Sequence, residues 1–403
     1  MYKYERKFIE WAEKNATVLL MIIISLLSLL ARYKLRNFES TDAIYFIEPW
    51  FETIKYRGGL KALGEQVGDY GIPYQTLIAF CTYLPFKGLN SCKVISVVFD
   101  YVLAIGCYKI TKLLTNRRYV SCIVYMVVLL APTVIFDSAM WGQCDSIYAS
   151  FCVFTIYFLM KDQDIAAFIC YGFAFAFKLQ SIFILPFIIL LYVKNKKISL
   201  LDFIYIPLVM FVSSLGGILQ GRPVSDVFLI YVNQTNTYAN RLTLNYPSIY
   251  GLWTQNSNDN LIPNSSAGSV MAICGFGICF LYCLRKIKKL SATDMLAFAF
   301  LSTYFATLTM PNMHERYSYL FVVLSIVLAA LNKKLILPCI GLLCIDMMTY
   351  GYYLTDDGYD LKLLTMFNIA LFCYYAYFIF KNRTEPEEKP IEKQAEPAEP
   401  AEK

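Results

Sequence analysis

Charged residues are scarce in this chain of 403 residues: Asp, Glu, Lys and Arg make up only 16% of it, and there is a single histidine. Soluble domains carry about 25% charged and about 45–50% apolar residues, whereas 58% of this chain is hydrophobic. Too few charges are present to cover a surface that faces water, so the composition argues against a soluble globular protein and against a disordered one. The net charge of +6 is scattered between apolar runs, and no nucleic-acid partner is expected.

Several motifs of cofactor and metal chemistry are also missing. The thirteen cysteines include no C-x-x-C pair, which leaves zinc and redox-pair sites with little support, and most of them lie in apolar runs where cysteine behaves as a small hydrophobe. The sequence has no glycine-rich nucleotide-binding loop and no H-E-x-x-H motif. We therefore expect neither a cofactor nor a metal ion.

Long apolar runs dominate the sequence instead, and a spanning helix needs roughly 17–25 mostly apolar residues. Such runs lie near 17–32, 92–114, 119–138, 144–160, 200–219, 268–284, 291–309, 317–331, 334–354 and 362–380. A further run, 165–193, is too long for one span and has Lys178 in its middle, so we predict two short helices that meet there. The fold class predicted is an all-α integral membrane protein with about twelve transmembrane helices. Whether residues 76–86 span the membrane or only dip into it stays open.

The lysine and arginine residues of the short links predict the orientation. Most of them fall on one side if the spans alternate, and such links stay in the cytoplasm. We expect a multi-pass protein of the cell membrane with both termini in the cytoplasm and larger outer segments at about 33–91 and 221–267. Residues 1–381 would form the membrane domain, with a helical first outer loop. Residues 382–403, rich in Glu, Pro and Ala, would form a disordered acidic cytoplasmic tail.

Two acidic motifs stand at outer ends of apolar runs. Glu39-Ser40-Thr41-Asp42 follows the first run, and Trp141-Gly142-Gln143-Cys144-Asp145-Ser146 precedes the run at 144–160. Helix capping explains both in part, because Ser or Thr caps a helix and an acid in the first turn suits its dipole. A carboxylate fixed at a helix start is equally well placed to act as a base. Trp, Gln and Asp together at a membrane edge also suit a sugar, with the aromatic ring as a plate for the sugar ring.

Two cations occupy places that disfavour a positive charge. Lys178, in the string Phe177-Lys178-Leu179-Gln180, would lie at the tip of a membrane hairpin, where it either snorkels to the interface or binds a lipid phosphate. Arg316, in the string His314-Glu315-Arg316-Tyr317, would open an outer-side helix, so Glu315 or an anionic substrate should compensate it. Asp100 and Asp346 lie within spans, either as functional acids or as structural partners of these two cations.

In combination, these motifs resemble the polytopic GT-C glycosyltransferases, specifically the bacterial relatives of the GPI-anchor mannosyltransferases. The likeness rests on Ser40-Thr41-Asp42 with Pro49-Trp50, on Trp141-Gly142-Gln143-Cys144-Asp145-Ser146, on Phe177-Lys178-Leu179-Gln180 with Pro186, and on Pro311-x-Met313-His314-Glu315-Arg316-Tyr317. It covers residues 40–317, and the multi-span layout extends it over most of the chain outside the tail.

The resemblance implies an inverting transfer of mannose or another hexose from a polyprenyl-phosphate sugar to a glycan or glycolipid acceptor, at the outer face, in cell-envelope glycan assembly. It implies Asp42 as the base and Asp145 as the second catalytic acid. Lys178, Arg316 and His314 would bind the donor phosphate. The substrates would further contact Glu39, Trp141, Gln143, Gln180, Glu315 and Tyr317.

Two other classes of protein remain as alternatives. A transporter or flippase of lipid-linked sugars would share the charged cavity and the many spans, but it requires polar residues along a continuous path to the inner face. A non-catalytic scaffold of an envelope complex would not account for four polar motifs at one face.

Overall fold

The computed structural model describes residues 2–237, 242–253, 265–355 and 358–383, and these confirm an all-α architecture. Within these ranges, the one sheet consists of two very short parallel strands, β1 (Thr243–Leu244) and β2 (Met313–His314). Most of the predicted tail, from residue 384 onward, lies outside the described residues.

Five of the described helices are long and apolar enough to cross a membrane. They are α1 (Lys3–Leu35), α4 (Gly88–Thr115), α13 (Ser265–Lys286), α16 (Ile336–Thr355) and α17 (Leu361–Asn382). A sixth candidate is a broken span, in which α5 (Arg118–Leu130) continues after a bend of 49° into α6 (Pro132–Ile135) and η3 (Phe136–Trp141). The bend falls at Pro132, which cannot continue the hydrogen bonding of α5. A membrane protein is therefore indicated.

The other predicted spans form shorter apolar helices, so the count of twelve stays a prediction. They are α7 (Asp145–Met160), α8 (Asp164–Phe177), α9 (Leu185–Asn195), α10 (Tyr205–Ser213) with α11 (Leu215–Leu219), α14 (Ala292–Thr309) and α15 (Tyr319–Leu331). Helix α15 is apolar on all sides and almost wholly buried, as expected for a central helix.

The run at 165–193 breaks at Lys178, as predicted. Helix α8 ends at Phe177, Lys178 has an extended backbone, and η4 (Leu179–Ile184) leads into α9. The segment predicted to be the first outer loop is helical, as expected, with η1 (Ala43–Ile47), α2 (Glu48–Tyr56), η2 (Gly59–Gly64) and α3 (Ile72–Cys81). Because ten helical residues rise only about 15 Å, half of a hydrocarbon core about 30 Å thick, α3 is too short to span.

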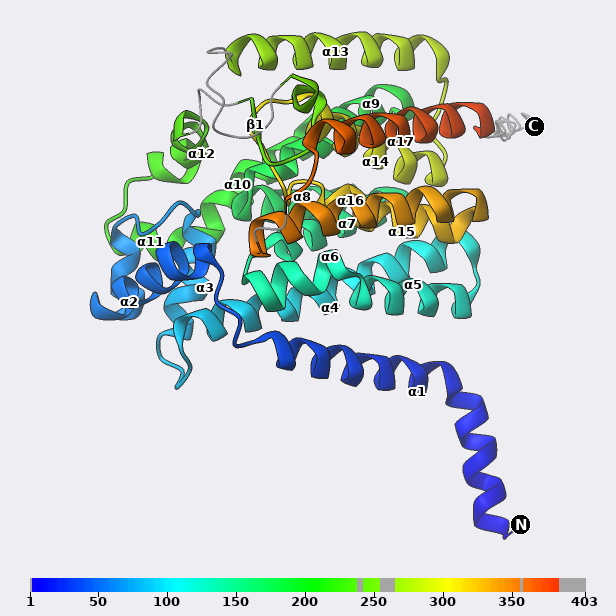
Figure 1. Cartoon of the computed structure of the whole chain (residues 1–403), viewed down its shortest axis with the longest axis horizontal. Coiled ribbons are helices and arrows are strands. Elements are labelled where there is room, and N and C mark those ends of the chain that lie inside the picture. Colours follow the sequence, from blue (N-terminus) through cyan, green and yellow to red (C-terminus); the bar gives the residue numbers. More distant parts are fainter. Residues whose placement is uncertain (1, 238–241, 254–264, 356–357, 384–403) are drawn as a thin grey trace, which may run out of the picture.

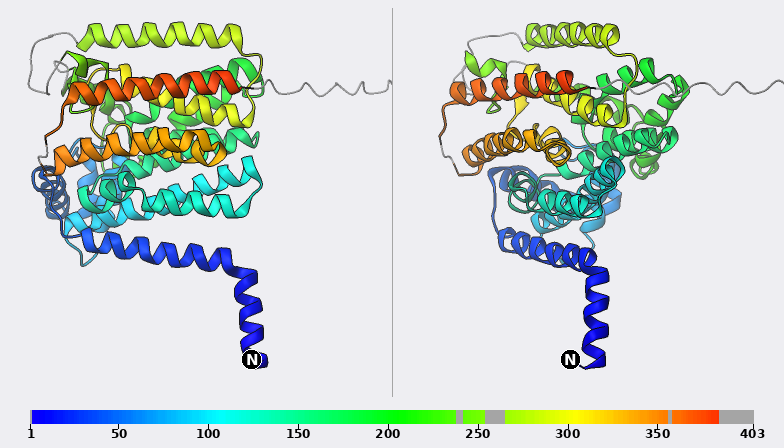
Figure 2. Two further views of the ribbon diagram at one scale, coloured as in Figure 1. Left: turned by 45° about the vertical axis from the view of Figure 1, so that its right-hand side comes forward. Right: turned by 90° about the vertical axis from the view of Figure 1, so that its right-hand side faces the viewer.

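The longer helices lie roughly side by side, with α1 along one flank of the bundle and α13 along the other (Figure 1). The N-terminal part of α1 turns away from the bundle (Figure 2). The largest buried core lies between these flanks and is built mainly from α4, α5, α7, α8, α14 and α15.

The two ends of the bundle have different chemistry. At one end, close to the C-terminus of α17, Asn195 contacts Leu290, and the guanidinium of Arg383 lies 3.4 Å from the carboxylate of Asp294. The lysine-rich links around residues 194–197 and 285–289 belong to this end. The opposite end carries α2, α3 and α12 (Ser225–Thr237) (Figure 1) and holds the polar motifs.

Candidate active site

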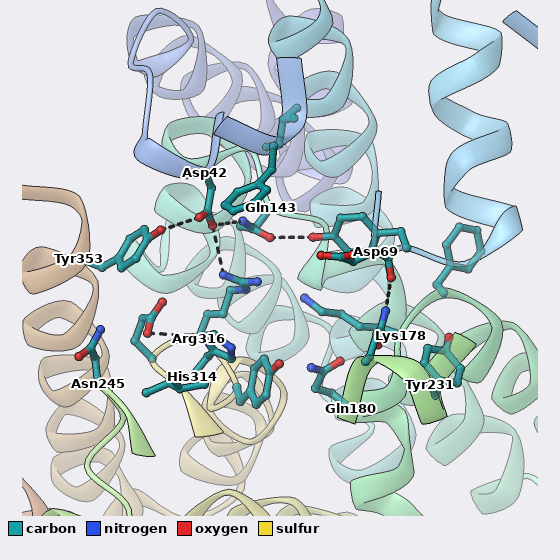
Figure 3. A pocket seen from close by; sticks show the side chains of 18 of the residues that line it. Asp42, Asp69, Gln143, Lys178, Gln180, Tyr231, Asn245, His314, Arg316 and Tyr353 are labelled. Carbon is teal, nitrogen blue, oxygen red and sulfur yellow. Dashed lines mark hydrogen bonds and ion pairs between the residues drawn. The ribbon is translucent and has the colours of Figure 1, made fainter. Parts of the chain in front are cut away.

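A cavity of about 340 Å³ lies at this end of the bundle and is lined by residues spread over the sequence from Asp42 to Tyr353 (Figure 3). Eight of the eleven site residues predicted from the sequence line it: Asp42, Gln143, Lys178, Gln180, His314, Glu315, Arg316 and Tyr317. The other three, Glu39, Trp141 and Asp145, do not. The sequence motifs therefore do converge on one site.

Asp42 reaches this cavity because Ser40 serves as the helix cap. The backbone N–H of Ala43 donates to Ser40 Oγ at 3.1 Å, and Ser40 Oγ in turn donates to the carbonyl of Trp141 at 3.3 Å. Asp42 itself caps nothing, so its carboxylate is left to face the cavity. The following turn, η1, is π-helical, a local distortion that is frequent at functional sites.

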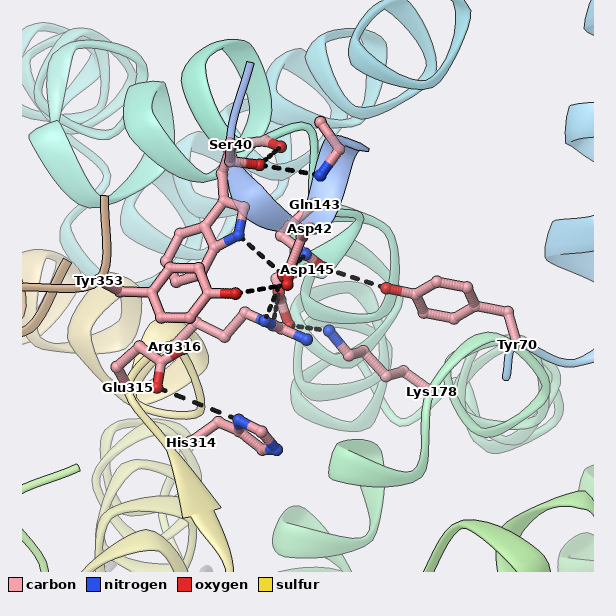
Figure 4. Close-up of polar contacts among 12 residues, drawn as sticks. Ser40, Asp42, Tyr70, Gln143, Asp145, Lys178, His314, Glu315, Arg316 and Tyr353 are labelled. Atoms are coloured by element: carbon pink, nitrogen blue, oxygen red, sulfur yellow. Dashed lines mark hydrogen bonds and ion pairs between the residues drawn. The ribbon is translucent and has the colours of Figure 1, made fainter. Parts of the chain in front are cut away.

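Four donors hold the Asp42 carboxylate in place (Figure 4). Oδ2 accepts from Trp141 Nε1 at 2.9 Å and Gln143 Nε2 at 2.7 Å, and lies 3.4 Å from Arg316 Nη1. Oδ1 accepts from Tyr353 Oη at 2.5 Å. Because a carboxylate oxygen has two lone pairs, Oδ1 keeps one acceptor position for a ligand hydroxyl.

Asp145 lies behind the cavity wall and does not line it, which corrects the expectation of a second acid in contact with substrate. Its side chain is fully buried. Oδ1 accepts from Lys178 Nζ at 2.5 Å, and Oδ2 lies 3.5 Å from Arg316 Nε. Asp145 therefore joins the two cations and fixes their positions.

The partners of the two cations differ from those expected. Arg316 does not open a helix, because α15 begins only at Tyr319. Its guanidinium is compensated by Asp42 and Asp145, not by Glu315. Lys178 is buried in its pair with Asp145, so it does not snorkel to an interface.

The two acids within spans also have partners other than these cations. Asp100 pairs with Arg32 at 2.8 Å. Asp346 accepts from Ser318 Oγ at 2.6 Å and from Thr133 Oγ1 at 3.0 Å. Both acids are fixed inside the bundle, and neither lines the cavity.

Trp141 and Glu39 also differ from their expected roles. Trp141 is fully buried and stacks on Tyr353, with ring centroids 4.6 Å apart and planes at 17°. It therefore orients Asp42 and cannot serve as a plate for a sugar ring. Glu39 is exposed and lies outside the cavity. Phe46 and Trp50 are among the aromatic side chains that do line the cavity.

Glu315, which lies next to His314, is a second acidic residue on the cavity wall. Glu315 is 1% exposed, and its Oε2 lies 4.0 Å from His314 Nδ1. Burial raises the pKa of Glu315 to about 7, although the neighbouring Arg316 opposes this shift. His314 is held in β2, which pairs with β1 from the segment before α13.

Sequence reasoning missed Tyr353 and Tyr70. Tyr353 lies near the end of α16, inside an apolar run, where one more tyrosine carries no distinct signal; the cluster Tyr350, Tyr352 and Tyr353 at the end of this span was the available hint. Tyr70, in the link between η2 and α3, donates to Gln143 Oε1 at 3.0 Å. Burial raises the pKa of Tyr70 well above its usual value, so it stays a neutral donor.

Chemically, the site can combine a carboxylate with two cations over a cavity large enough for a small polar ligand. Within the described residues, no group of three or more His, Cys, Asp and Glu side chains is placed to hold a metal ion. No protein-family model matches the sequence, and no curated protein shows significant similarity to it.

Proposed function

We propose that the protein is a GT-C-type membrane glycosyltransferase that moves a hexose, such as mannose, from a polyprenyl-phosphate donor to a glycan or glycolipid acceptor. One observation carries the proposal: Asp42 faces the cavity beside Lys178 and Arg316, which come from segments far apart in the sequence. Such a site supplies a base and a phosphate-binding pair of cations together.

In the proposed reaction, Asp42 takes the proton of the acceptor hydroxyl as its oxygen attacks the anomeric carbon. The bond from that carbon to the phosphate oxygen breaks on the opposite face, so the configuration inverts. Charge then gathers on the departing polyprenyl phosphate, where Lys178 and Arg316 stabilise it. Asp145, Trp141 and Gln143 act as positioning residues, because they hold the two cations or Asp42 in place.

The membrane setting belongs to the same proposal. With about twelve spans and both termini in the cytoplasm, the cavity opens at the outer face, where nucleotide sugars made in the cytoplasm cannot reach it and a lipid-linked donor can. The volume of about 340 Å³ suits a sugar phosphate, since ligand pockets run from about 300 to 1,000 Å³.

A flippase of lipid-linked sugars is the main alternative. It needs a polar path through the bilayer, whereas the charged residues that line this cavity gather at one end of the bundle. The enzyme is therefore the better-supported choice.

The test is transfer of radiolabelled sugar from polyprenyl-phosphate mannose or glucose by the purified protein in proteoliposomes that contain envelope lipids as acceptors. We expect labelled glycan or glycolipid together with released polyprenyl phosphate. Movement of intact donor across the bilayer without cleavage of the sugar–phosphate bond would instead establish the flippase.

A further inference from the structure

Glu315 is a buried acid on the cavity wall that the reaction described above does not use. It lies in the loop between α14 and α15, outside the spanning helices, and its side chain is 2% exposed. Its Oε2 has no hydrogen-bond partner among the described residues. Arg316, the next residue, directs its guanidinium to Asp42 and Asp145 instead. Burying a charged carboxylate with one oxygen left unpaired is costly, so the neutral acid is favoured.

The surroundings of Glu315 point the same way. Burial is the largest cause of a pKa raised to about 7; Arg316 and a backbone hydrogen bond oppose the rise, and the carboxylates of Asp42 and Asp145 contribute to it. The titratable groups that face Glu315 from its own loop and from the elements packed against it are His314, Arg316, Tyr317, Asp42, Asp145, Tyr353 and Tyr359. At neutral pH a large share of the molecules therefore hold a proton on Glu315.

Charge balance in the cavity gives this proton a use. Lys178 and Arg316 are already offset by Asp145 and Asp42, so the four groups sum to zero. A polyprenyl-phosphate sugar carries one negative charge, and the released phosphate carries nearly two, since its second pKa is about 6. Once Asp42 has taken the acceptor proton, the two cations and Asp145 offset only one of these charges.

We propose that Glu315 enters the reaction as a neutral acid and gives its proton to the phosphate oxygen of the leaving polyprenyl phosphate. The sugar–oxygen bond breaks, the phosphate leaves as a monoanion, and Glu315 becomes a carboxylate. The acceptor proton on Asp42 later restores the neutral acid at Glu315, so one proton passes from the acceptor to the phosphate in each cycle. This inference rests on the proposed glycosyl transfer.

The first arm of the test reads the protonation of Glu315 without any activity. The pKa of Glu315 is about 7 in the folded protein and about 4.3 in the unfolded chain. Wild-type stability should therefore fall as pH rises through this window and level off above it. Glu315→Gln does not titrate. The thermal midpoint of Glu315→Gln minus that of wild type should therefore increase by some degrees from pH 5 to pH 8. The exposed variant Glu52→Gln should follow wild type over the same range. A constant difference would overturn the proposal.

The second arm measures sugar transfer from polyprenyl-phosphate hexose between pH 5.5 and 9. Wild-type turnover should fall about tenfold per pH unit above pH 7. Glu315→Gln should be slower by on the order of 10²-fold and lack this limb, and Glu315→Asp should recover part of the rate with the limb. A near wild-type rate in Glu315→Gln, or the same limb in it, would overturn the proposal. No transfer by wild type would overturn the glycosyltransferase as well.

Discussion

Two arginine–aspartate contacts in this protein differ in how far they are buried and in what surrounds them. Arg32 of α1 contacts Asp100 of α4 at 2.8 Å, and both side chains are at most 2% exposed. The pair is enclosed by further hydrogen bonds: Arg32 donates to the carbonyl of Leu129 at 3.0 Å, and Asp100 accepts from Ser138 Oγ at 2.6 Å. This enclosed pair joins α1 to the bundle.

The contact of Arg316 is longer and divided between two carboxylates. Its guanidinium lies 3.4 Å from Asp42 and 3.5 Å from Asp145, and Arg316 and Asp42 are each 14% exposed toward the cavity. A guanidinium held by such long contacts can donate hydrogen bonds to a phosphate instead. The same two residue types therefore hold helices together where they are enclosed and can bind a ligand where they are open.

Replacing the acid of the open contact should remove activity and spare the fold. Asp42→Asn keeps the side-chain shape, and Ser40 still caps the helix, so we expect little change in thermal stability. Turnover should fall by on the order of 10²–10⁴-fold, the usual contribution of a general base. The measurement is sugar transfer by the purified variant, with exposed Glu52→Gln as the control. Near-normal turnover would show that Asp42 is not the base.

Replacing the acid of the enclosed pair should have the opposite effect. Asp100→Asn leaves Arg32 buried without its counter-charge, which typically costs about 3–5 kcal/mol of unfolding free energy. Turnover per folded molecule should stay close to wild type. Thermal unfolding in detergent checks this, with Asp162→Asn as the matched control, because the Lys197–Asp162 pair is about half exposed and such surface pairs contribute about 0–1 kcal/mol.

Equal stability of Asp100→Asn and Asp162→Asn would contradict the structural role of the enclosed pair. A loss of turnover in folded Asp100→Asn would instead link α1 to the positioning of Asp42.

The ends of the helices could be predicted from the sequence better than the side of each helix that faces the protein interior. Apolar runs and capping residues placed Asp42 and Arg316 at the same end of the bundle, and the charge within the run at 165–193 predicted the break at Lys178. These inferences depend only on position along the chain.

The predictions that failed depend on the rotation of a helix about its axis and on the packing of segments that are distant in sequence. Trp141 and Asp145 stand in the correct motif but point into the protein, and Asp100 pairs with Arg32, which no motif contains. Tyr353 joins the site only because α16 packs so that this residue meets Asp42 across 311 positions of sequence. No local pattern encodes such a contact.

The smallest predicted effect also tests the central claim most directly, namely that the open arginine holds a lipid phosphate. The measurement is equilibrium binding of a polyprenyl phosphate to detergent-purified wild type and Arg316→Gln, with the matching polyprenol as ligand control and Arg57→Gln, whose pair is exposed, as protein control. Losing a hydrogen bond to a charged group costs about 1.5–3 kcal/mol, or about 10–150-fold in affinity. We predict this loss in Arg316→Gln for the phosphate alone. Equal affinity of wild type for the phosphate and the polyprenol, or unchanged phosphate binding in folded Arg316→Gln, would contradict the account.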